Sequence, residues 1–151
     1  MLKHLMIRSV ALVDELGLTF ENGLNVLTGE TGAGKSIIVD AVSFLLGGRA
    51  DKDMIRAGST KAYVEGSFDV ADNQSALSFL NDAEIEAEEG QITLSREMNV
   101  SGRSVCRING IAVNLSMLKD LSARLIDIHG QHEHQSLLDE RNHLRFLDAF
   151  G

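Results

Sequence analysis

The sequence predicts an α/β fold built around a phosphate-binding loop, because three patterns follow one another along the chain. An apolar run over residues 24–28 is a candidate buried strand, and the octapeptide over 29–36 reads GETGAGKS. An apolar stretch over 35–46 is a candidate helix. This strand–loop–helix order is the setting in which the spacing G-x-x-x-x-G-K-[ST] binds the phosphates of a nucleotide.

Each residue type in the octapeptide has a separate task around a polyphosphate. Glycines let backbone N–H groups approach phosphate oxygens where a Cβ would collide, and the start of the following helix favours anionic charge. Lys35 supplies a cation for the β- and γ-phosphates, and the Ser36 hydroxyl is placed to coordinate Mg²⁺. A chance glycine-rich turn is the alternative, but every required position is filled. The expected contacts are Gly29, Glu30, Thr31, Gly32, Ala33, Gly34, Lys35, Ser36 and Ile37.

Composition limits what the rest of the chain can be. The 151 residues are 44% hydrophobic, which is enough for one ordinary domain, and no apolar run approaches the roughly 18 to 20 residues of a membrane span. With 14 Lys and Arg against 22 Asp and Glu, the formal charge of −8 gives no global basic field for nucleic acid. Cys106 is the only cysteine, and the first residues lack a secretory signal. We therefore expect a cytoplasmic protein without disulfides or membrane contact.

The elements before and around the loop follow from hydrophobic patterning. Residues 2–9 suit a strand, and even-numbered residues from Leu12 to Phe20 share one side of a second extended run. Glu21-Asn22-Gly23 is typical of a tight turn. The helix over 35–46 is apolar on most sides, which predicts burial against a sheet, and Gly47-Gly48 ends it before a polar loop.

The middle of the chain has antiparallel β character. Residues 61–70 alternate between apolar and polar, a short helix is expected over 74–81, and strands are expected over 91–98 and 103–108. Asn109-Gly110 is a strong hairpin signal that leads into a brief strand over 111–113.

Two helices are expected toward the end. Asn114 can cap a helix over about 115–124, whose apolar stripe is Leu115, Leu118 and Leu121. A short strand over 125–128 follows, and Asp139 can cap a final helix. No proline or linker-like stretch divides the chain, so residues 1–151 are interpreted as one unit.

A phosphate loop alone does not identify a reaction, so its usual companions matter. The sequence lacks the Asn-Lys-x-Asp segment of a GTPase. A hydrolase also needs an acid at the end of a separate buried strand. Asp127 is the candidate, but its apolar run is short, which favours an ordinary polar residue. The segment IHGQHEHQ over 128–135 suggests a metal site or a polar loop, although its histidines lack the H-E-x-x-H spacing.

The octapeptide together with IVDAV over 38–42 and LLGGRA over 45–50 resembles the amino-terminal lobe of the RecN family. These are bacterial DNA-repair ATPases of the SMC-like branch of ABC-type ATPases. Further agreement comes from MIRxG over 54–58, VEGSFD over 64–69, CRING over 106–110 and the segment over 128–135. The resemblance implies an ABC-type head lobe with a mixed sheet and an antiparallel β subdomain.

The resemblance also implies roles for single residues around ATP and Mg²⁺. Gly29, Gly32, Gly34, Lys35 and Ser36 match the Walker A residues. Gln131 matches the glutamine that reaches Mg²⁺ and the attacking water, with Gln135 as the alternative, and Arg56 matches an arginine-loop position. Lys35 and Gln131 are thus the expected catalytic residues, and Ser36 and Gln131 the expected metal ligands. Related heads often carry Asn-Phe where this chain has Ser9-Val10, which leaves the adenine contacts open.

Members of this family continue into a coiled coil and a carboxy-terminal lobe that holds the signature motif, the Walker B aspartate and the catalytic glutamate. The chain is therefore expected to be a fragment that ends before the coiled coil and hydrolyses little ATP alone. Implied partners are that lobe, a second head in a homodimer, and DNA through the full-length protein, in double-strand-break repair, recombination and the SOS response at the nucleoid. Alternatives are a self-contained P-loop kinase or a nucleotide-dependent scaffold module. Lys52, Arg56 and Lys61 are local candidates for DNA contact or simply solvated surface.

Overall fold

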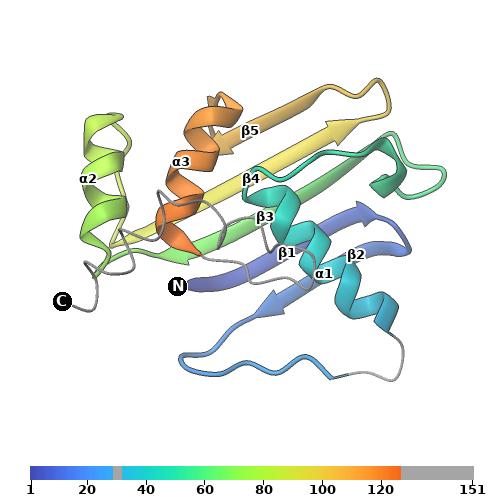
Figure 1. The fold of residues 1–151 in the computed structure, drawn as a ribbon, viewed down its shortest axis with the longest axis horizontal. Coiled ribbons are helices and arrows are strands. Elements are labelled where there is room, and N and C mark those ends of the chain that lie inside the picture. Colours follow the sequence, from blue (N-terminus) through green and yellow to red (C-terminus); the bar gives the residue numbers. More distant parts are fainter. Residues whose placement is uncertain (29–31, 127–151) are drawn as a thin grey trace, which may run out of the picture.

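The computed structural model describes residues 1–28 and 32–126, which form a sheet with helices on one face (Figure 1). The sheet has six strands in the order β2-β1-β3-β4-β5-β6, and every pair is antiparallel. No helix among these residues is long and apolar enough to cross a bilayer. In chain order the elements are β1 (Leu2–Val10), β2 (Val13–Thr19), α1 (Gly32–Leu45), a 3₁₀ turn (Lys52–Met54), β3 (Lys61–Asp69), α2 (Gln74–Asp82), β4 (Gln91–Asn99), β5 (Ser104–Ile108), β6 (Ile111–Val113) and α3 (Leu115–Leu125).

The alternation predicted for β3 is confirmed. Ala62, Val64 and Phe68 are fully buried under the helices, and the alternate residues Tyr63, Glu65 and Ser67 lie on the other face of the sheet. Gly66 completes the inner face, because a Cβ there would stand 2.7 Å from the Leu45 side chain of α1. The missing side chain thus lets α1 pack directly on β3.

The hairpin predicted at Asn109-Gly110 is also confirmed. Asn109 and Gly110 have φ values of 49° and 78°, and Ile108 pairs with Ile111 across them. Positive φ at both central residues is the mark of the type I′ turn, whose twist matches that of the strands it joins. The register of β5 and β6 is therefore set locally by these two residues.

The helix ends follow the predicted capping residues. Gly47 has φ 99° and donates its N–H to the Phe44 carbonyl at 3.1 Å, while the Gly48 N–H reaches the Ser43 carbonyl at 2.8 Å, which together form a Schellman ending for α1. The Asn114 side chain accepts from the Met117 N–H at 2.8 Å and caps α3.

Helix α3 runs one residue further than predicted. The Ile126 N–H donates to the Ser122 carbonyl at 3.1 Å, so the helical hydrogen bonds continue past Leu125, which the sequence had assigned to a strand over 125–128. Leu118 and Leu121 of the predicted stripe are fully buried, whereas Leu115 is 39% exposed.

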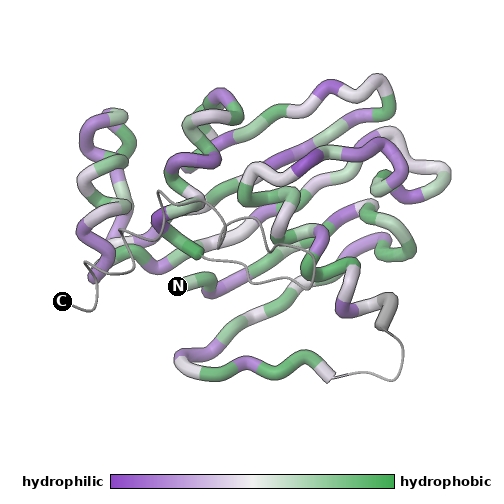
Figure 2. Tube along the Cα trace, viewed as in Figure 1, coloured by the Kyte–Doolittle hydropathy of each residue, from purple (hydrophilic) through white to green (hydrophobic). Residues whose placement is uncertain are grey.

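One prediction about the opening is wrong: residues 24–28 form no strand. Leu24 is 91% exposed, Val26 68% and Leu27 41%, and the segment follows the lower edge of the molecule as an apolar arm (Figures 1 and 2). A buried strand needs partners for its backbone and a layer over its side chains, and the described strands supply neither. The sheet that the structure describes is consequently antiparallel throughout, and the predicted β subdomain is continuous with β1 and β2.

Candidate nucleotide-binding site

The candidate site lies at the start of α1. Gly34, Lys35 and Ser36 are exposed in the first turn, and the described part of that turn contains no acidic residue. The N-terminus of a helix carries partial positive charge and directs N–H groups outward, so it attracts a polyphosphate. The position of Lys35 adds a full positive charge at the same end of the helix.

The space around Gly34 fits a phosphate group. A Cβ built at Gly34 meets no atom of the described residues within 4 Å, so the backbone is open to a ligand on that side. Gly32 and Ala33 belong to the helix, whereas Gly29, Glu30 and Thr31 lie outside the described residues. The part of the predicted loop that the structure describes is therefore open and carries a cation, both of which a polyphosphate site needs.

The two halves of α1 differ in burial. Ala41, Phe44 and Leu45 in the second half are buried, but Val39 is 47% exposed and Ile37 is half-buried. The expectation of burial on most sides therefore holds only for the second half. The first half projects past the sheet edge that β2 forms (Figure 1).

A buried arginine that the sequence analysis missed holds the far end of α1. Arg96 of β4 is 3% exposed and donates from Nη1 to the Phe44 carbonyl at 2.7 Å and the Gly48 carbonyl at 2.6 Å. A cation suits the negative end of a helix, so Arg96 fixes the end opposite the phosphate loop. The period-two pattern of β4 indicates that Arg96 points inward, since it is in phase with the inward residues Leu94 and Met98.

Arg56 is placed beside the β1–β2 turn. Its Nη1 lies 3.4 Å from Oδ1 of Asp14, and its backbone N–H donates to the Ser9 carbonyl at 2.9 Å. These two contacts hold Arg56 against β1 and β2. The other predicted groups, including Gln131, Gln135, Asp127 and the histidines over 129–134, lie outside the described part of the chain.

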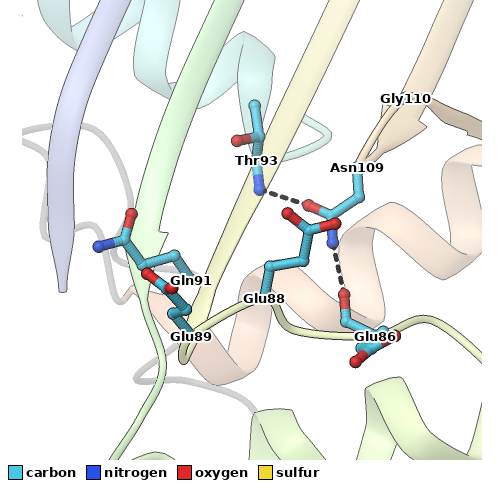
Figure 3. Close-up of a pocket in the computed structure, with 7 residues that line it drawn as sticks. All are labelled: Glu86, Glu88, Glu89, Gln91, Thr93, Asn109 and Gly110. Atoms are coloured by element: carbon cyan, nitrogen blue, oxygen red, sulfur yellow. Dashed lines mark hydrogen bonds between the residues drawn. The ribbon is translucent and has the colours of Figure 1, made fainter.

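A hollow of about 830 Å³ at the start of β4 is chemically unsuited to a nucleotide. Glu86, Glu88 and Glu89 line it, and Figure 3 shows Asn109 joining Thr93 to the backbone of Glu86 through hydrogen bonds of 2.8 and 2.7 Å. Three carboxylates repel phosphates. In the described ranges, no three His, Cys, Asp or Glu side chains come together to hold a metal ion. The start of α1 is thus the better nucleotide site.

Comparisons with known proteins agree with this fold. The family model described as "RecF/RecN/SMC N terminal domain" matches residues 1–129. DNA repair protein RecN from Bacillus subtilis is 45% identical over all 151 residues, and that from Halalkalibacterium halodurans is 46% identical, the chain covering 26% and 27% of these proteins. The chain therefore spans about a quarter of the length of the curated relatives it matches.

Solved structures show the same architecture. One from work on ATP-driven dimerisation and DNA-stimulated activation of SMC ATPases has a TM-score of 0.69 at 22% identity, covering 99% of both chains. The SMC head domain from Thermotoga maritima has a TM-score of 0.60 at 27% identity, covering 79% of this chain and 41% of that one. The fold and the open start of α1 define the amino-terminal lobe of an ABC-type P-loop ATPase. The chain belongs to the RecF/RecN/SMC N-terminal domain family, and its whole-chain similarity is to RecN.

Proposed function

We propose that this lobe binds ATP and Mg²⁺ over residues 29–36, as part of a cytoplasmic RecN-type ATPase that acts on DNA double-strand breaks. The observation that carries the proposal is the exposed first turn of α1, where Lys35 and Ser36 stand beside the open backbone of Gly34. Relatives named DNA repair proteins support the biological setting.

The chain's own residues would divide the work at this site. Lys35 balances phosphate charge, while Ser36 and Gln131 are the proposed ligands of Mg²⁺, which supplies charge stabilisation for phosphoryl transfer when bound. Arg56 is proposed to act on the nucleotide from the arginine-loop position. Since its guanidinium pairs with Asp14 at 3.4 Å, this role requires the exposed ion pair to open, which costs about 1 kcal/mol or less.

Hydrolysis is proposed to need a carboxy-terminal lobe and a second head. The apolar arm over residues 24–28 supports this, because Leu24 and Val26 expose side chains that a folded protein ordinarily covers. A strand from another lobe beside the arm would give it the backbone partners that the described sheet lacks.

Nucleotide binding is tested by titrating a fluorescent ATP analogue with the full-length protein and its Lys35→Ala variant. Loss of one charged hydrogen-bond donor should weaken binding about tenfold to a hundredfold. Lys119→Ala, at an exposed position on α3, is the matched control and should bind like the wild type. Equal affinities of all three proteins would refute the proposed site.

A second experiment separates an ATPase from a kinase or a scaffold. The 151-residue chain is mixed with a carboxy-terminal lobe, and ATP turnover is measured with and without DNA. The proposal expects negligible turnover from each lobe alone and restored turnover in the mixture. Turnover by the single chain would favour a self-contained kinase, and nucleotide-dependent association without turnover would favour a scaffold.

A further inference from the structure

The face of the sheet opposite the helices carries a basic hollow at the end formed by β3, β4 and β5. The hollow has a volume of about 290 Å³ and is lined by Lys61, Glu97, Asn99, Arg103, Val105 and Arg107. Its side chains belong to the outward face, because their neighbours Ala62, Met98 and Cys106 are buried on the inward face. Among the described residues, no helix covers this side of the sheet (Figure 1).

The charges in the hollow leave an excess of positive charge. Lys61 Nζ and Arg107 Nη1 share one oxygen of Glu97, Oε2, at 3.4 and 3.8 Å. Arg103 is exposed, and no carboxylate of the described residues lies within 4.0 Å of its guanidinium. Three cations thus face one carboxylate, in a chain whose overall charge is −8. A local field opposite to the global one favours an anion at this place.

A hydrogen-bonded turn holds the backbone of Arg103 beside the hollow. The Asn99 side-chain oxygen accepts from the backbone N–H groups of Ser101 at 3.1 Å and Arg103 at 3.0 Å. The Asn99 N–H donates to the Arg103 carbonyl at 3.0 Å, and Gly102 takes φ 87° to close the turn. Because hydrogen bonds fix the backbone of Arg103 from both sides, the main chain needs no ordering when a ligand binds.

We propose that this hollow binds a phosphodiester group of the DNA backbone, with Arg103 as its main anchor and Lys61 and Arg107 as supporting cations. Arginine forks and lysine ammonium groups are the usual ligands of backbone phosphates, and such contacts carry no sequence preference. The hollow of about 290 Å³ has room for a phosphate group, and the uncovered sheet face beside it admits a long polymer. The choice of DNA rests on the proposed function.

The test measures binding of the full-length protein to a short fluorescent DNA duplex over a salt series. Arg103→Glu should weaken binding about tenfold at low salt and lower the slope of log K against log salt by about one. Lys61→Gln should have a smaller effect of the same kind. Lys119→Glu changes the net charge equally but lies on α3, on the other face, and should leave affinity and slope unchanged.

The outcomes separate this inference from the proposed function. If the wild type binds DNA and Arg103→Glu behaves like Lys119→Glu, the phosphate site is refuted while the DNA-repair proposal stands. If the wild type binds no DNA in any nucleotide state, both the site and the DNA part of the proposed function fail. Inorganic phosphate at constant ionic strength forms a further arm of the test. If phosphate binds to the hollow but Arg103→Glu does not change DNA affinity, the site belongs to a small anion instead.

Discussion

The guanidinium of Arg96 lies over the ring of Phe44, 4.4 Å from its centroid, and donates to the carbonyl of the same residue at 2.7 Å. One side chain of the sheet thus holds both the side chain and the backbone of the helix that begins at the phosphate loop. Arg96 Nε also donates to Ser104 Oγ at 3.0 Å, which ties the contact to β5. Burial disfavours the charged form of Arg96 and so lowers its pKa. The negative end of α1 acts in the opposite direction, because it favours a cation.

We expect Arg96→Met to lower the free energy of unfolding by about 2 to 4 kcal/mol, because it removes the Arg96 donor from the Gly48 carbonyl and leaves the Phe44 carbonyl only its bond from the Gly47 N–H. Urea unfolding followed by circular dichroism measures the change. Arg103→Met removes an exposed guanidinium and should alter stability by less than about 0.5 kcal/mol. Similar losses in the two variants would contradict a special role of Arg96.

Two glycines should respond in opposite ways to alanine. Gly34 stands in α1 with open space where a Cβ would go, so Gly34→Ala should raise stability by about 0.5 to 1 kcal/mol through helix propensity. The added methyl group would occupy the side from which a phosphate approaches. Nucleotide affinity should therefore fall at least about tenfold, and a fluorescent ATP analogue measures it. Unchanged affinity would show that the ligand does not approach this side of α1.

Gly66→Ala should instead destabilise the lobe. Its Cβ would stand 2.7 Å from Leu45 Cδ2 and 3.2 Å from Leu2 Cδ1, both in the packed layer between the sheet and α1. Overpacking of this kind costs about 1 to 3 kcal/mol. Urea unfolding measures the loss, and wild-type stability would mean that α1 moves away from β3 at little cost.

The response to alkaline pH follows from Cys106. Burial raises the pKa of this thiol above its ordinary value, so over the range between the two values the unfolded chain binds fewer protons than the folded one. Stability is therefore fully present below about pH 9 and falls as pH rises through the folded pKa. The pKa of Tyr63 is also raised by burial and by its hydrogen bond to Glu65, which extends the loss to higher pH.

Cys106→Ala should flatten the first part of this fall, which begins above about pH 9. The slope of unfolding free energy against pH is the quantity to compare, since alanine also leaves a small cavity that lowers stability at every pH. Tyr63→Phe is the matched variant and should change only the more alkaline part. A slope identical to that of the wild type would exclude Cys106 as the titrating group.

Sequence reasoning succeeded where the signal was local. The Asn109-Gly110 turn, the Asn114 cap and the alternation of β3 depend on neighbouring residues and backbone sterics, and all three are present in the structure. The placement of Arg96 depends on a long-range contact between β4 and the end of α1. Arg96 is in phase with the inward residues of β4, but no local pattern indicates which carbonyl groups it meets there.

The features of the candidate site likewise include some that the sequence predicts and some that it does not. The spacing of the octapeptide predicted the open start of α1, because each position has a separate chemical requirement. The pairing of Arg56 with Asp14 could not be predicted, since it joins a loop to β2 across 42 positions of sequence. Residues 24–28 were predicted as a strand from composition alone, and composition does not say whether a partner strand is present.

The apolar arm gives the last prediction. Leu24→Ser and Val26→Ser remove side chains that are 91% and 68% exposed, so in the 151-residue chain they should change unfolding free energy by less than about 0.5 kcal/mol. If a second lobe covers the arm, the same variants should lose the ATP turnover that mixing with a carboxy-terminal lobe restores, because each serine removes apolar area that association would bury. Leu12→Ser, at a residue 82% exposed before β2, is the matched control and should leave both measurements unchanged. Full turnover in the Leu24 and Val26 variants would mean that the arm is not the surface on which the second lobe docks.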